Sequence, residues 1–202
     1  MKKEIVIATK NEKKFKELKR FFHSSRIKVL SLKEFPQVPE VVEDGETFGD
    51  NAIKKALAAS RHTDKIVLAD DSGLEVNALD MRPGVHSARY AGPGKTDDRN
   101  MEKLLKALKG IDPKRRTARF RCVIAIARER RVLKLVEGVC EGRIGFVKEG
   151  ATGFGYDPVF IPRGRKKTFA QLGSREKDRL SHRGKALRKA KGFIQRYLLK
   201  GL

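Results

Sequence analysis

Two neighbouring carboxylates, Asp70 and Asp71, follow directly after the apolar run Lys65–Ala69. Adjacent carboxylates repel each other, so holding them together is costly unless a cation or hydrogen-bond donors compensate their charge. The apolar run is typical of a strand buried on both faces, and ligands of α/β sheets bind at the carboxyl ends of such strands. The pair therefore favours metal binding or catalysis over a plain turn.

A second group of acids precedes the predicted helix Phe48–Arg61. Glu43, Asp44 and Glu46 stand close together in a chain that is otherwise basic. One explanation is that acids just before a helix simply interact with the positive end of the helix dipole. They can equally hold a divalent cation, because hard cations prefer carboxylate oxygen. The segment is therefore a second candidate for metal binding.

A possible phosphate site lies near the start of the chain. The apolar run Glu4–Thr9 predicts a buried strand, and apolar residues at helical spacing follow after a short polar turn. A strand, a tight turn and a helix N-terminus present backbone N–H groups and the positive end of a helix dipole to an anion. Thr9, Asn11 and Lys14 are candidates for holding phosphate, although the same pattern also occurs as a helix cap with a solvated lysine.

The segment Gly153–Pro158 combines aromatic side chains, glycines and an acid, and Lys177 and Ser181-His182-Arg183 follow it. Glycine allows the backbone to approach a ligand closely, an aromatic face stacks on a base, and cations form charge-assisted hydrogen bonds. The segment is typical of half of a nucleotide pocket. A turn between a strand and a helix is the alternative.

The same periodicities outline the elements that must position these residues. Further strands are predicted at 27–30, 117–127, 132–139, 140–147 and 159–161, and further helices at 99–109 and within 176–200. The runs 117–127 and 132–139 predict an antiparallel hairpin, and glycines beyond it indicate a strongly curved sheet. Thr47 is the expected N-cap of helix 48–61, whose Lys54 and Lys55 can point outward. Asp97 or Asp98 is expected to cap helix 99–109.

Composition bounds the class of protein. The 202 residues suffice for one core with a side lobe, and 47 Lys and Arg against 25 acids give a net charge of +22. Fourteen of the cations fall within 163–200, where Glu176 and Asp178 are the acids. Such a charge attracts phosphate-bearing small molecules and nucleic acid, but a highly charged surface adapted to heat explains it equally well.

Other classes are disfavoured. Apolar runs are far shorter than the roughly 20 residues of a membrane helix, and the start of the chain has no signal-peptide pattern. Cys122 and Cys140 lie in apolar runs without metal-ligand spacing, which predicts buried thiols. A cytoplasmic protein is the expectation.

Taken together, these segments resemble the inosine triphosphate pyrophosphatase family, also described as dITP/XTP or non-standard purine NTP pyrophosphatases. The resemblance runs nearly from end to end of the chain. It is carried by Thr9-Lys10-Asn11-Glu12-Lys13-Lys14, Glu43–Phe48 with Asn51-Ala52, Ala69–Leu74, Pro83–Tyr90, Gly153–Pro158 and Ser181-His182-Arg183. Each motif alone is weak, but their occurrence together in this order is specific. Asp50 departs from the usual pattern, which has Glu there.

The resemblance implies a mixed α/β fold: an elongated, two-lobed single domain over 1–202, with a long curved central mixed sheet flanked by helices and a nucleotide cleft between the lobes. It also implies a homodimer, dependence on Mg²⁺, and a small-molecule nucleoside triphosphate as partner, with no membrane and no required nucleic acid. Asp71 would be the catalytic base, and Asp71 and Glu43 the metal ligands. The implied substrate-binding residues are Thr9, Lys10, Asn11, Glu12, Lys13, Lys14, Ser72, Phe154, Gly155, Tyr156, Asp157, Lys177, His182 and Arg183.

The implied reaction is hydrolysis of dITP, ITP and XTP to the monophosphate and pyrophosphate. A magnesium ion neutralises phosphate charge that would repel a nucleophile, and a carboxylate orients or deprotonates the attacking water. Donors from His182 and Arg183 would face the 6-oxo group of the base. Adenine presents an amino donor there, and a mismatched buried polar group costs about 1–3 kcal/mol.

Three other interpretations stay in view. A basic nucleic-acid-binding protein explains the charge but leaves the acids at 43 and 70–71 without a purpose. A pyrophosphatase for modified pyrimidine or methylated nucleotides, as in septum-formation proteins, fits the motifs at 153–157 and 181–183 less well. A non-catalytic nucleotide sensor would bind the same ligand without releasing pyrophosphate.

Overall fold

The computed structural model describes residues 3–23 and 27–200. Its longer elements are β1 (Lys3–Ile7), α1 (Glu12–Phe22), β2 (Ile27–Ser31), α2 (Phe48–Ser60), β3 (Ile66–Val76), α3 (Asp97–Ala107), β4 (Thr117–Arg128), β5 (Arg131–Ile144), β6 (Phe160–Pro162), α4 (Ser174–Leu180) and α5 (His182–Lys200). The predicted mixed α/β class is confirmed.

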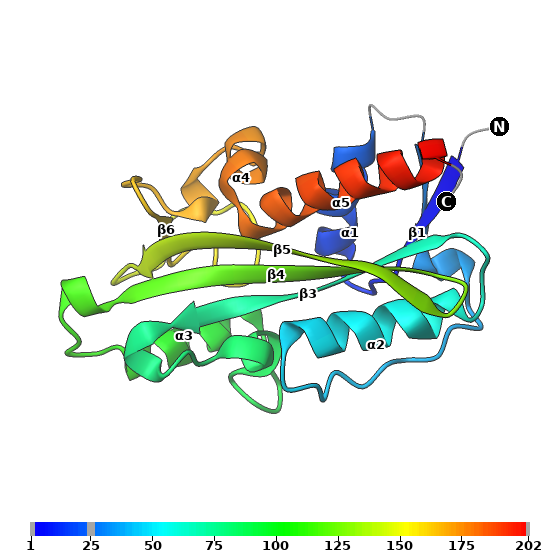
Figure 1. Cartoon of the computed structure of the whole chain (residues 1–202). Helices are drawn as coiled ribbons and strands as arrows, with labels where there is room; N and C mark the ends of the chain where they lie inside the picture. The colour runs from blue at the N-terminus through cyan, green and yellow to red at the C-terminus, as the bar shows by residue number, and fades with distance from the viewer. Residues whose placement is uncertain (1–2, 24–26, 201–202) are drawn as a thin grey trace. The chain divides into compact units, whose positions relative to one another are not determined.

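Six strands form one mixed sheet in the order β2-β1-β3-β4-β5-β6 (Figure 1). β1 runs parallel to both β2 and β3, whereas β5 and β6 are antiparallel. Parallel strands buried on both faces require apolar side chains at successive positions, which explains the continuous apolar run Ile5–Ile7 in β1. The sheet is the frame on which the candidate site residues stand.

The strand that carries the acid pair is longer than the sequence indicated. We expected it to end at Ala69, but β3 continues without interruption through Asp70, Asp71 and Ser72 to Val76. Its pairing with β1 does end early, since the last paired residues are Ile7 and Leu68. The acids therefore follow the end of the parallel pairing and lie in the middle of the strand.

The chain divides into two compact units. The first holds the chain up to Asp71, Cys122–Gly138 and the stretch from Lys185 onward. The second holds Ser72–Arg121 and Val139–Gly184. Each unit has its own apolar cluster, so each can be described by itself.

In the first unit, strand residues pack with α1 and the C-terminal helix α5. Buried members of this cluster are Ile5, Ile7, Leu18, Phe22, Ile66, Leu68, Cys122, Ile124, Ile126, Ala186, Leu187, Ala190 and Ile194. In Figure 1, α1 and α5 cover one face of this part of the sheet, and α2 lies on the opposite face. The buried side of α2 includes Ala52, Ala56 and Ala59, small residues that keep the helix close to the strands.

In the second unit, α3 and the chain around β6 pack on the sheet. Buried members of this cluster are Leu74, Val76, Met101, Leu104, Leu108, Ala118, Phe120, Cys140, Ile144, Tyr156, Val159, Phe160, Phe169 and Leu172. Met101 and Leu104 of α3, with Leu108 directly after the helix, supply its contacts with this core. Cys122 and Cys140 are buried thiols, as predicted.

The ends of two helices were predicted with different success. Thr47 caps α2 as expected: its hydroxyl accepts a hydrogen bond from the Asp50 N–H at 3.1 Å, and Asp50 accepts one from the Thr47 N–H at 3.0 Å. Asp50, the residue that departs from the family pattern, thus completes a capping box. The expected cap of α3 was wrong, because Thr96 accepts from Arg99 and the helix begins at Asp97.

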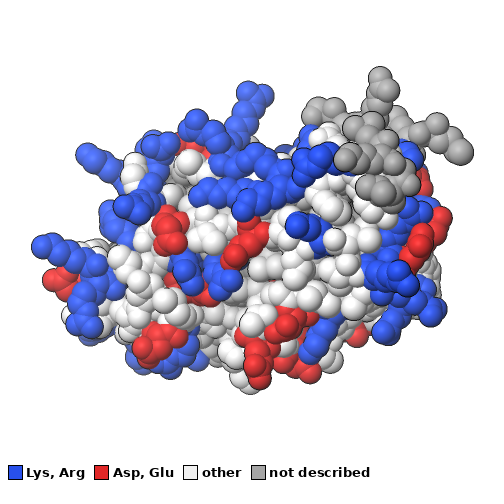
Figure 2. Space-filling view, viewed as in Figure 1, with Lys and Arg blue, Asp and Glu red and all other residues white. Residues whose placement is uncertain are grey.

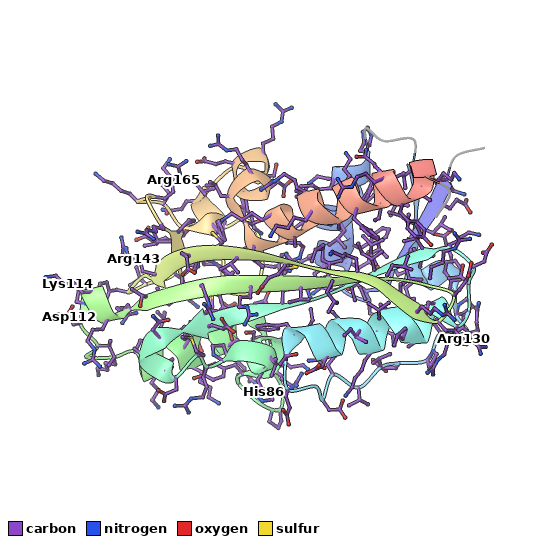
Figure 3. All side chains as sticks on the ribbon, viewed as in Figure 1. His86, Asp112, Lys114, Arg130, Arg143 and Arg165 are labelled. Atoms are coloured by element: carbon purple, nitrogen blue, oxygen red, sulfur yellow. The ribbon has the colours of Figure 1, made fainter. Side chains whose placement is uncertain are left out.

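The surface is strongly basic. Figure 2 shows Lys and Arg side chains gathered over α5 on the face that it draws. In the second unit, exposed cations include Arg143 on β5 and Arg165 in the turn after β6 (Figure 3). Within the described residues, no helix is long and apolar enough to cross a membrane.

The predicted hairpin is confirmed in β4 and β5. Glu129 and Arg130 form its two-residue turn with φ angles of 51° and 64°, and Arg130 lies at its tip (Figure 3). Two consecutive positive φ angles match the twist of paired strands, which is why this turn type joins hairpins. β5 then continues to Ile144 in the same strand that we had divided at Cys140.

Candidate active site

The turn after β1 is organised by its own polar side chains. The Asn11 N–H donates to Thr9 Oγ1 at 3.2 Å, and Asn11 Oδ1 accepts from the Lys14 N–H at 3.0 Å. Asn11 is therefore the N-cap of α1, with an extended backbone that favours this role. The cap leaves the first turn of α1 exposed at Asn11, Glu12 and Lys13, where an anion can approach the positive end of the helix dipole.

Lys14 turns from this helix toward the acid pair. Its Nζ lies 3.0 Å from Asp70 Oδ2, and only 16% of the Lys14 side chain is exposed. The Ala8 N–H donates to the Leu68 carbonyl at 2.7 Å, so the turn after β1 starts beside the part of β3 that leads into the acids. Lys14 thus supplies the compensating charge that lets β3 continue through Asp70.

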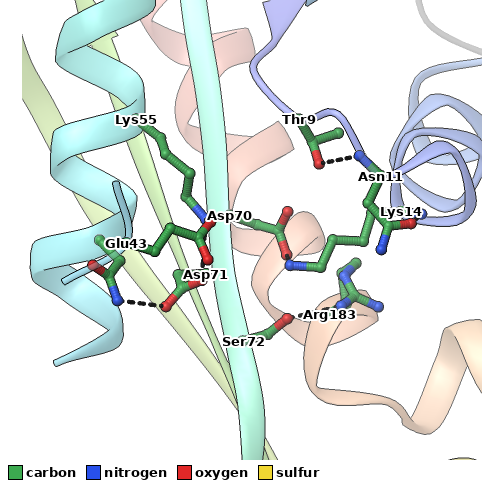
Figure 4. Close-up of polar contacts among 10 residues, drawn as sticks. Thr9, Asn11, Lys14, Glu43, Lys55, Asp70, Asp71, Ser72 and Arg183 are labelled. Atoms are coloured by element: carbon green, nitrogen blue, oxygen red, sulfur yellow. Dashed lines mark hydrogen bonds and ion pairs between the residues drawn. The ribbon is translucent and has the colours of Figure 1, made fainter. Parts of the chain in front are cut away.

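A second lysine joins Asp71 to the acidic segment. Lys55 Nζ lies 2.6 Å from Glu43 Oε1 and 3.0 Å from Asp71 Oδ1 (Figure 4). The prediction that Lys55 faces solvent was wrong, since its side chain is 14% exposed. Its neighbour Lys54 is exposed as predicted and pairs with Asp44 at 2.6 Å. Two carboxylates from distant segments therefore converge on one cation, which singles out Glu43 from the other acids before α2.

Asn51 holds the same two segments through the hydrogen bonds of its uncharged amide. Its Nδ2 donates to Asp71 Oδ2 at 3.3 Å, and its Oδ1 accepts from the Gly45 N–H at 2.8 Å. Because the backbone N–H can only donate, this partner fixes which end of the amide is the oxygen. Asn51 and Lys55, one helical turn apart, together hold both oxygens of Asp71.

The charges of this group are set by burial and by mutual attraction. Burial raises the pKa of Asp71, although the ammonium groups of Lys55 and Lys14 act against it. Burial alone would raise the pKa of Glu43, but Lys55 outweighs it and the pKa is lowered. Burial would lower the pKa of Lys55, but Asp71, Asp70 and Glu43 outweigh it and raise the pKa. The result is a cationic Lys55, an anionic Glu43 and an Asp71 carboxylate of increased basicity.

The oxygen donors here suit a magnesium ion that is also bound by phosphates. Glu43 and Asp71 already offer one carboxylate oxygen each to a single cation, the Lys55 ammonium. Across the described ranges, no group of three or more His, Cys, Asp or Glu side chains is gathered as for a complete metal cage. Mg²⁺ usually binds through one or two carboxylates plus substrate phosphates and water, so this donor set fits it.

The second unit holds the aromatic and cationic candidates. Asp157 Oδ2 accepts from the Phe154 N–H at 2.8 Å and from Lys177 Nζ at 2.7 Å, and both ionic side chains are buried. A Cβ on Gly153, whose φ is +84°, would collide with the same carboxylate, so this position requires glycine. Breaking a buried ion pair costs about 3–5 kcal/mol. The pair therefore fixes the shape of the motif that presents Phe154.

Two cations lie close to the ring of Phe154. Lys177 Nζ is 4.9 Å and the Arg183 guanidinium carbon 5.4 Å from the centre of its ring. Arg183 Nη2 also donates to Ser72 Oγ at 2.8 Å (Figure 4). The structure thus brings Phe154, Lys177, Arg183 and Ser72 into one connected group, with aromatic and donor surfaces that suit a purine base.

The remaining predicted residues of the second unit have roles in packing and in local hydrogen bonding. Tyr156 is buried in the apolar cluster and donates through its hydroxyl to the Ser87 carbonyl at 2.9 Å. His182 stacks on Phe120 with ring centres 4.5 Å apart. The Gly155 N–H donates to Asp97 Oδ2 at 2.9 Å. Their contacts with a substrate stay predictions.

Three residues of the first motif lie at its exposed rim. Lys10 pairs with Glu40 at 3.2 Å, and Glu12 pairs with Lys33. Lys13 is exposed on the first turn of α1. A role in substrate binding stays a prediction for each of these residues.

Sequence reasoning missed Asn51 and Lys55 as members of the site. Lys55 was expected to point outward, as lysines on amphipathic helices usually do, and Asn51 was noted only as part of a family motif, without a role in the site. Their spacing of four residues, one helical turn, was the available signal. It becomes informative only when the acids at 43 and 71 are known to lie on the same side of that helix.

Comparisons with known proteins agree with these features. A model of the Ham1 family matches residues 5–193. The dITP/XTP pyrophosphatase of Geobacillus kaustophilus (strain HTA426) is 52% identical over 187 residues, covering 93% of this chain and 92% of that protein. The dITP/XTP pyrophosphatase of Bacillus subtilis (strain 168) is 47% identical over 193 residues, covering 96% of this chain and 98% of that protein.

A solved structure leads to the same assignment. The structure of a HAM1 protein from Coxiella burnetii superposes with a TM-score of 0.87 at 41% identity and covers 96% of this chain and 99% of that one. The resemblance seen in the sequence motifs is thereby confirmed over nearly the full length. The chain belongs to the Ham1 family.

Proposed function

We propose that this protein is a nucleoside triphosphate pyrophosphatase that hydrolyses dITP, ITP and XTP to the monophosphate and pyrophosphate. The observation that carries the proposal is the convergence of Glu43 and Asp71 on one cation position. Relatives that are 46–52% identical bear the name dITP/XTP pyrophosphatase, which supports the same reaction. Such an enzyme would remove non-standard purine nucleotides from the precursor pool.

The acidic group of the first unit would carry the chemistry. Glu43 and Asp71 would hold Mg²⁺, which when bound neutralises negative charge on the phosphates. Asp71 would orient the water that attacks the α-phosphorus and would accept a proton from it, and pyrophosphate would leave. Thr9, Asn11 and Lys14 would hold the triphosphate through donors at the start of α1.

The aromatic group of the second unit would hold the base. Phe154 would stack on the purine, and Arg183 with His182 would donate toward its 6-oxo group. The buried ion pair between Asp157 and Lys177 would hold the motif in place. The 6-amino group of adenine is itself a hydrogen-bond donor. Opposite Arg183 and His182 it would leave the donors of the base and of the protein without an acceptor.

The first experiment is release of pyrophosphate from dITP, XTP, dATP, dGTP and dTTP, each measured separately with Mg²⁺. We expect release from dITP and XTP in large excess over the other three. Asp71→Asn should abolish it, because an amide can neither accept the proton nor supply the anionic metal ligand. Asp80→Asn is the matched control, since Asp80 is an exposed aspartate that pairs at 3.7 Å with Arg82 on the surface.

Other outcomes would point elsewhere. Tight dITP binding without pyrophosphate release would support a nucleotide sensor. Hydrolysis confined to modified pyrimidine nucleotides would support a pyrophosphatase of the kind found in septum-formation proteins. Steeply salt-dependent binding of nucleic acid without any hydrolysis would support the nucleic-acid-binding alternative.

The proposal includes four further properties. The enzyme would require Mg²⁺, act as a homodimer, and work in the cytoplasm as one catalytic domain over residues 1–202. Removing divalent metal with EDTA should stop pyrophosphate release, and adding Mg²⁺ should restore it. Light scattering coupled to size-exclusion chromatography would give the mass to compare with the 22.8 kDa of one chain.

A further inference from the structure

We infer that Asn51 is a positioning residue that sets the distance and orientation between the acidic segment at 43–45 and Asp71. The inference rests on the proposed function, because it concerns the two carboxylates that would hold Mg²⁺. Asn51 carries no charge and is not itself proposed to touch the metal or the reacting atoms. It acts by holding Asp71 on one side and the backbone of the acidic segment on the other.

A side-chain amide is suited to this task. One end must accept from the Gly45 N–H at 2.8 Å, and the other must donate to Asp71 Oδ2 at 3.3 Å. Asparagine is the shortest side chain that offers a donor and an acceptor on a planar, uncharged group. Asn51 is 1% exposed, so water cannot replace either partner without entering the protein.

The acidic segment is shaped to reach this amide. A Cβ at Gly45 would lie 2.7 Å from Asn51 Oδ1 and 2.8 Å from Asp50 Cβ. Any larger residue there would push the segment away from Asn51. The capping box between Thr47 and Asp50 fixes the turn between Gly45 and the helix that carries Asn51. The distance from the acidic segment to α2 is thus fixed by the close approach at Gly45, before Thr47, and by the capping box with Asp50, after it.

Asn51 and Lys55 divide the work of holding Asp71. Lys55 contacts Oδ1 and shares its charge with Glu43, whereas Asn51 contacts Oδ2 and is neutral. The long, flexible side chain of a lysine can move when the charges around it change. A short, neutral amide that is hydrogen-bonded at both ends keeps its position. Asn51 therefore defines where Asp71 points when the charge in the site changes. Residues that orient ligands from behind typically affect metal affinity or activity by about 10–100-fold.

The test compares Asn51→Ala with Asn100→Ala. Asn100 is also buried and also holds a loop at both ends of its amide: Oδ1 accepts from the Ala91 N–H at 2.7 Å, and Nδ2 donates to the Ala88 carbonyl at 3.3 Å. It belongs to α3 in the second unit and holds backbone groups of the loop before that helix, so its replacement reproduces the structural damage without the proposed function. Both variants should lower the melting temperature to a similar degree.

The decisive measurement is the Mg²⁺ concentration that gives half-maximal pyrophosphate release from dITP. Asn51→Ala should raise it about 10-fold or more, with much of the rate recovered at high Mg²⁺ and little change in KM for dITP. Asn100→Ala should leave it within about twofold of the original. An unchanged Mg²⁺ requirement in Asn51→Ala, or a decrease in rate that added Mg²⁺ does not restore, would overturn the inference.

A second measurement does not depend on hydrolysis. Binding of Mn²⁺ in the presence of pyrophosphate, followed by electron paramagnetic resonance, should weaken in Asn51→Ala and not in Asn100→Ala. If the original protein releases no pyrophosphate from dITP, the proposed function fails, and this titration still decides whether Asn51 positions a metal site. Equal Mn²⁺ binding in both variants would reject the positioning role. Should Asn51→Ala fail to fold, Asn51→Ser, which retains a polar group, carries the same comparison.

Discussion

The guanidinium of Arg183 is held at two points, by the hydroxyl of Ser72 and by the ring of Phe154. A cation fixed in this way presents donors in one direction, which is what discrimination between a 6-oxo and a 6-amino purine requires. Replacing Arg183 with Ala should therefore reduce the ratio of dITP to dATP hydrolysis by about tenfold, the equivalent of about 1.4 kcal/mol. The ratio of kcat/KM values for the two nucleotides is the measurement.

The control for that substitution is Arg175→Ala, because Arg175 is an exposed arginine on the short helix α4. It should leave the ratio unchanged. If Arg183→Ala slows both nucleotides equally, Arg183 contributes to binding in general and the idea that it selects the base is wrong.

At the residue scale, the sequence was informative where chemistry demands unusual residue types. Adjacent carboxylates and a glycine-flanked aromatic are rare enough to stand out, so Asp71 and Phe154 were identified as candidates before the structure. Lys55 was not, because burial of a lysine depends on acids that come from two distant segments. Such a contact has no local signature, since a lysine on a helix face has the same sequence pattern whether it is exposed or paired.

At the scale of elements, α2 is the part that carries both residues behind Asp71, so its first turn should influence the site. Thr47→Ala removes the N-cap hydroxyl and should lower the free energy of unfolding by about 1 kcal/mol. It should also raise the Mg²⁺ requirement, because the turn beside Gly45 is then no longer anchored. Chemical denaturation and the Mg²⁺ dependence of pyrophosphate release are the two measurements.

The matched change is Thr96→Ala, which removes the equivalent hydroxyl at the start of α3. We expect the same decrease in stability and no change in the Mg²⁺ requirement. Equal effects of both variants on the Mg²⁺ requirement would mean that a general decrease in stability, and not the position of α2, is responsible.

Elements were predicted well where periodicity is strong and less well where charges interrupt it. The helices around Leu18 and Leu104 follow their apolar spacing, and Thr47 caps α2 as its position suggests. The end of β3 was misplaced because the apolar run that predicted the strand stops at Ala69, and Asp70 and Asp71 repel each other unless their charges are compensated. The ammonium groups of Lys14 and Lys55 offset that repulsion, and their positions depend on the fold.

At the scale of the molecule, strand order could not be derived from the sequence. β1 lies between β2 and β3, and this order depends on contacts between residues far apart in the chain. The mixed α/β class, in contrast, follows from the alternation of strand and helix patterns. The curved mixed sheet flanked by helices was implied by the family resemblance, and not by a physical argument about the order of the strands.

The net charge of +22 is the property of the whole molecule that the proposed reaction leaves unexplained. A dense exposed run of cations is the turn after β6, where Arg163, Arg165, Lys166 and Lys167 fall within five residues and Arg165 pairs with Glu176 at 3.1 Å. A run of cations without aromatic residues favours contact with a phosphate backbone over stacking on bases. We therefore expect duplex DNA to bind weakly at low salt, with an affinity that falls steeply as salt rises.

Changing those four residues to Gln should reduce the slope of log affinity against log salt by about 0.9 for each phosphate that the protein no longer neutralises, while dITP hydrolysis stays unchanged. The control changes Lys106, Lys109, Lys114 and Arg115 to Gln, since these cations are also exposed in the second unit and their replacement lowers the charge equally. Fluorescence anisotropy of a labelled duplex at several salt concentrations gives both slopes. If the two slopes fall equally, the total charge attracts DNA and the turn after β6 has no special part in it. A larger decrease in the first variant would show that this turn is a local anion-binding surface, with a function other than that proposed for Glu43 and Asp71.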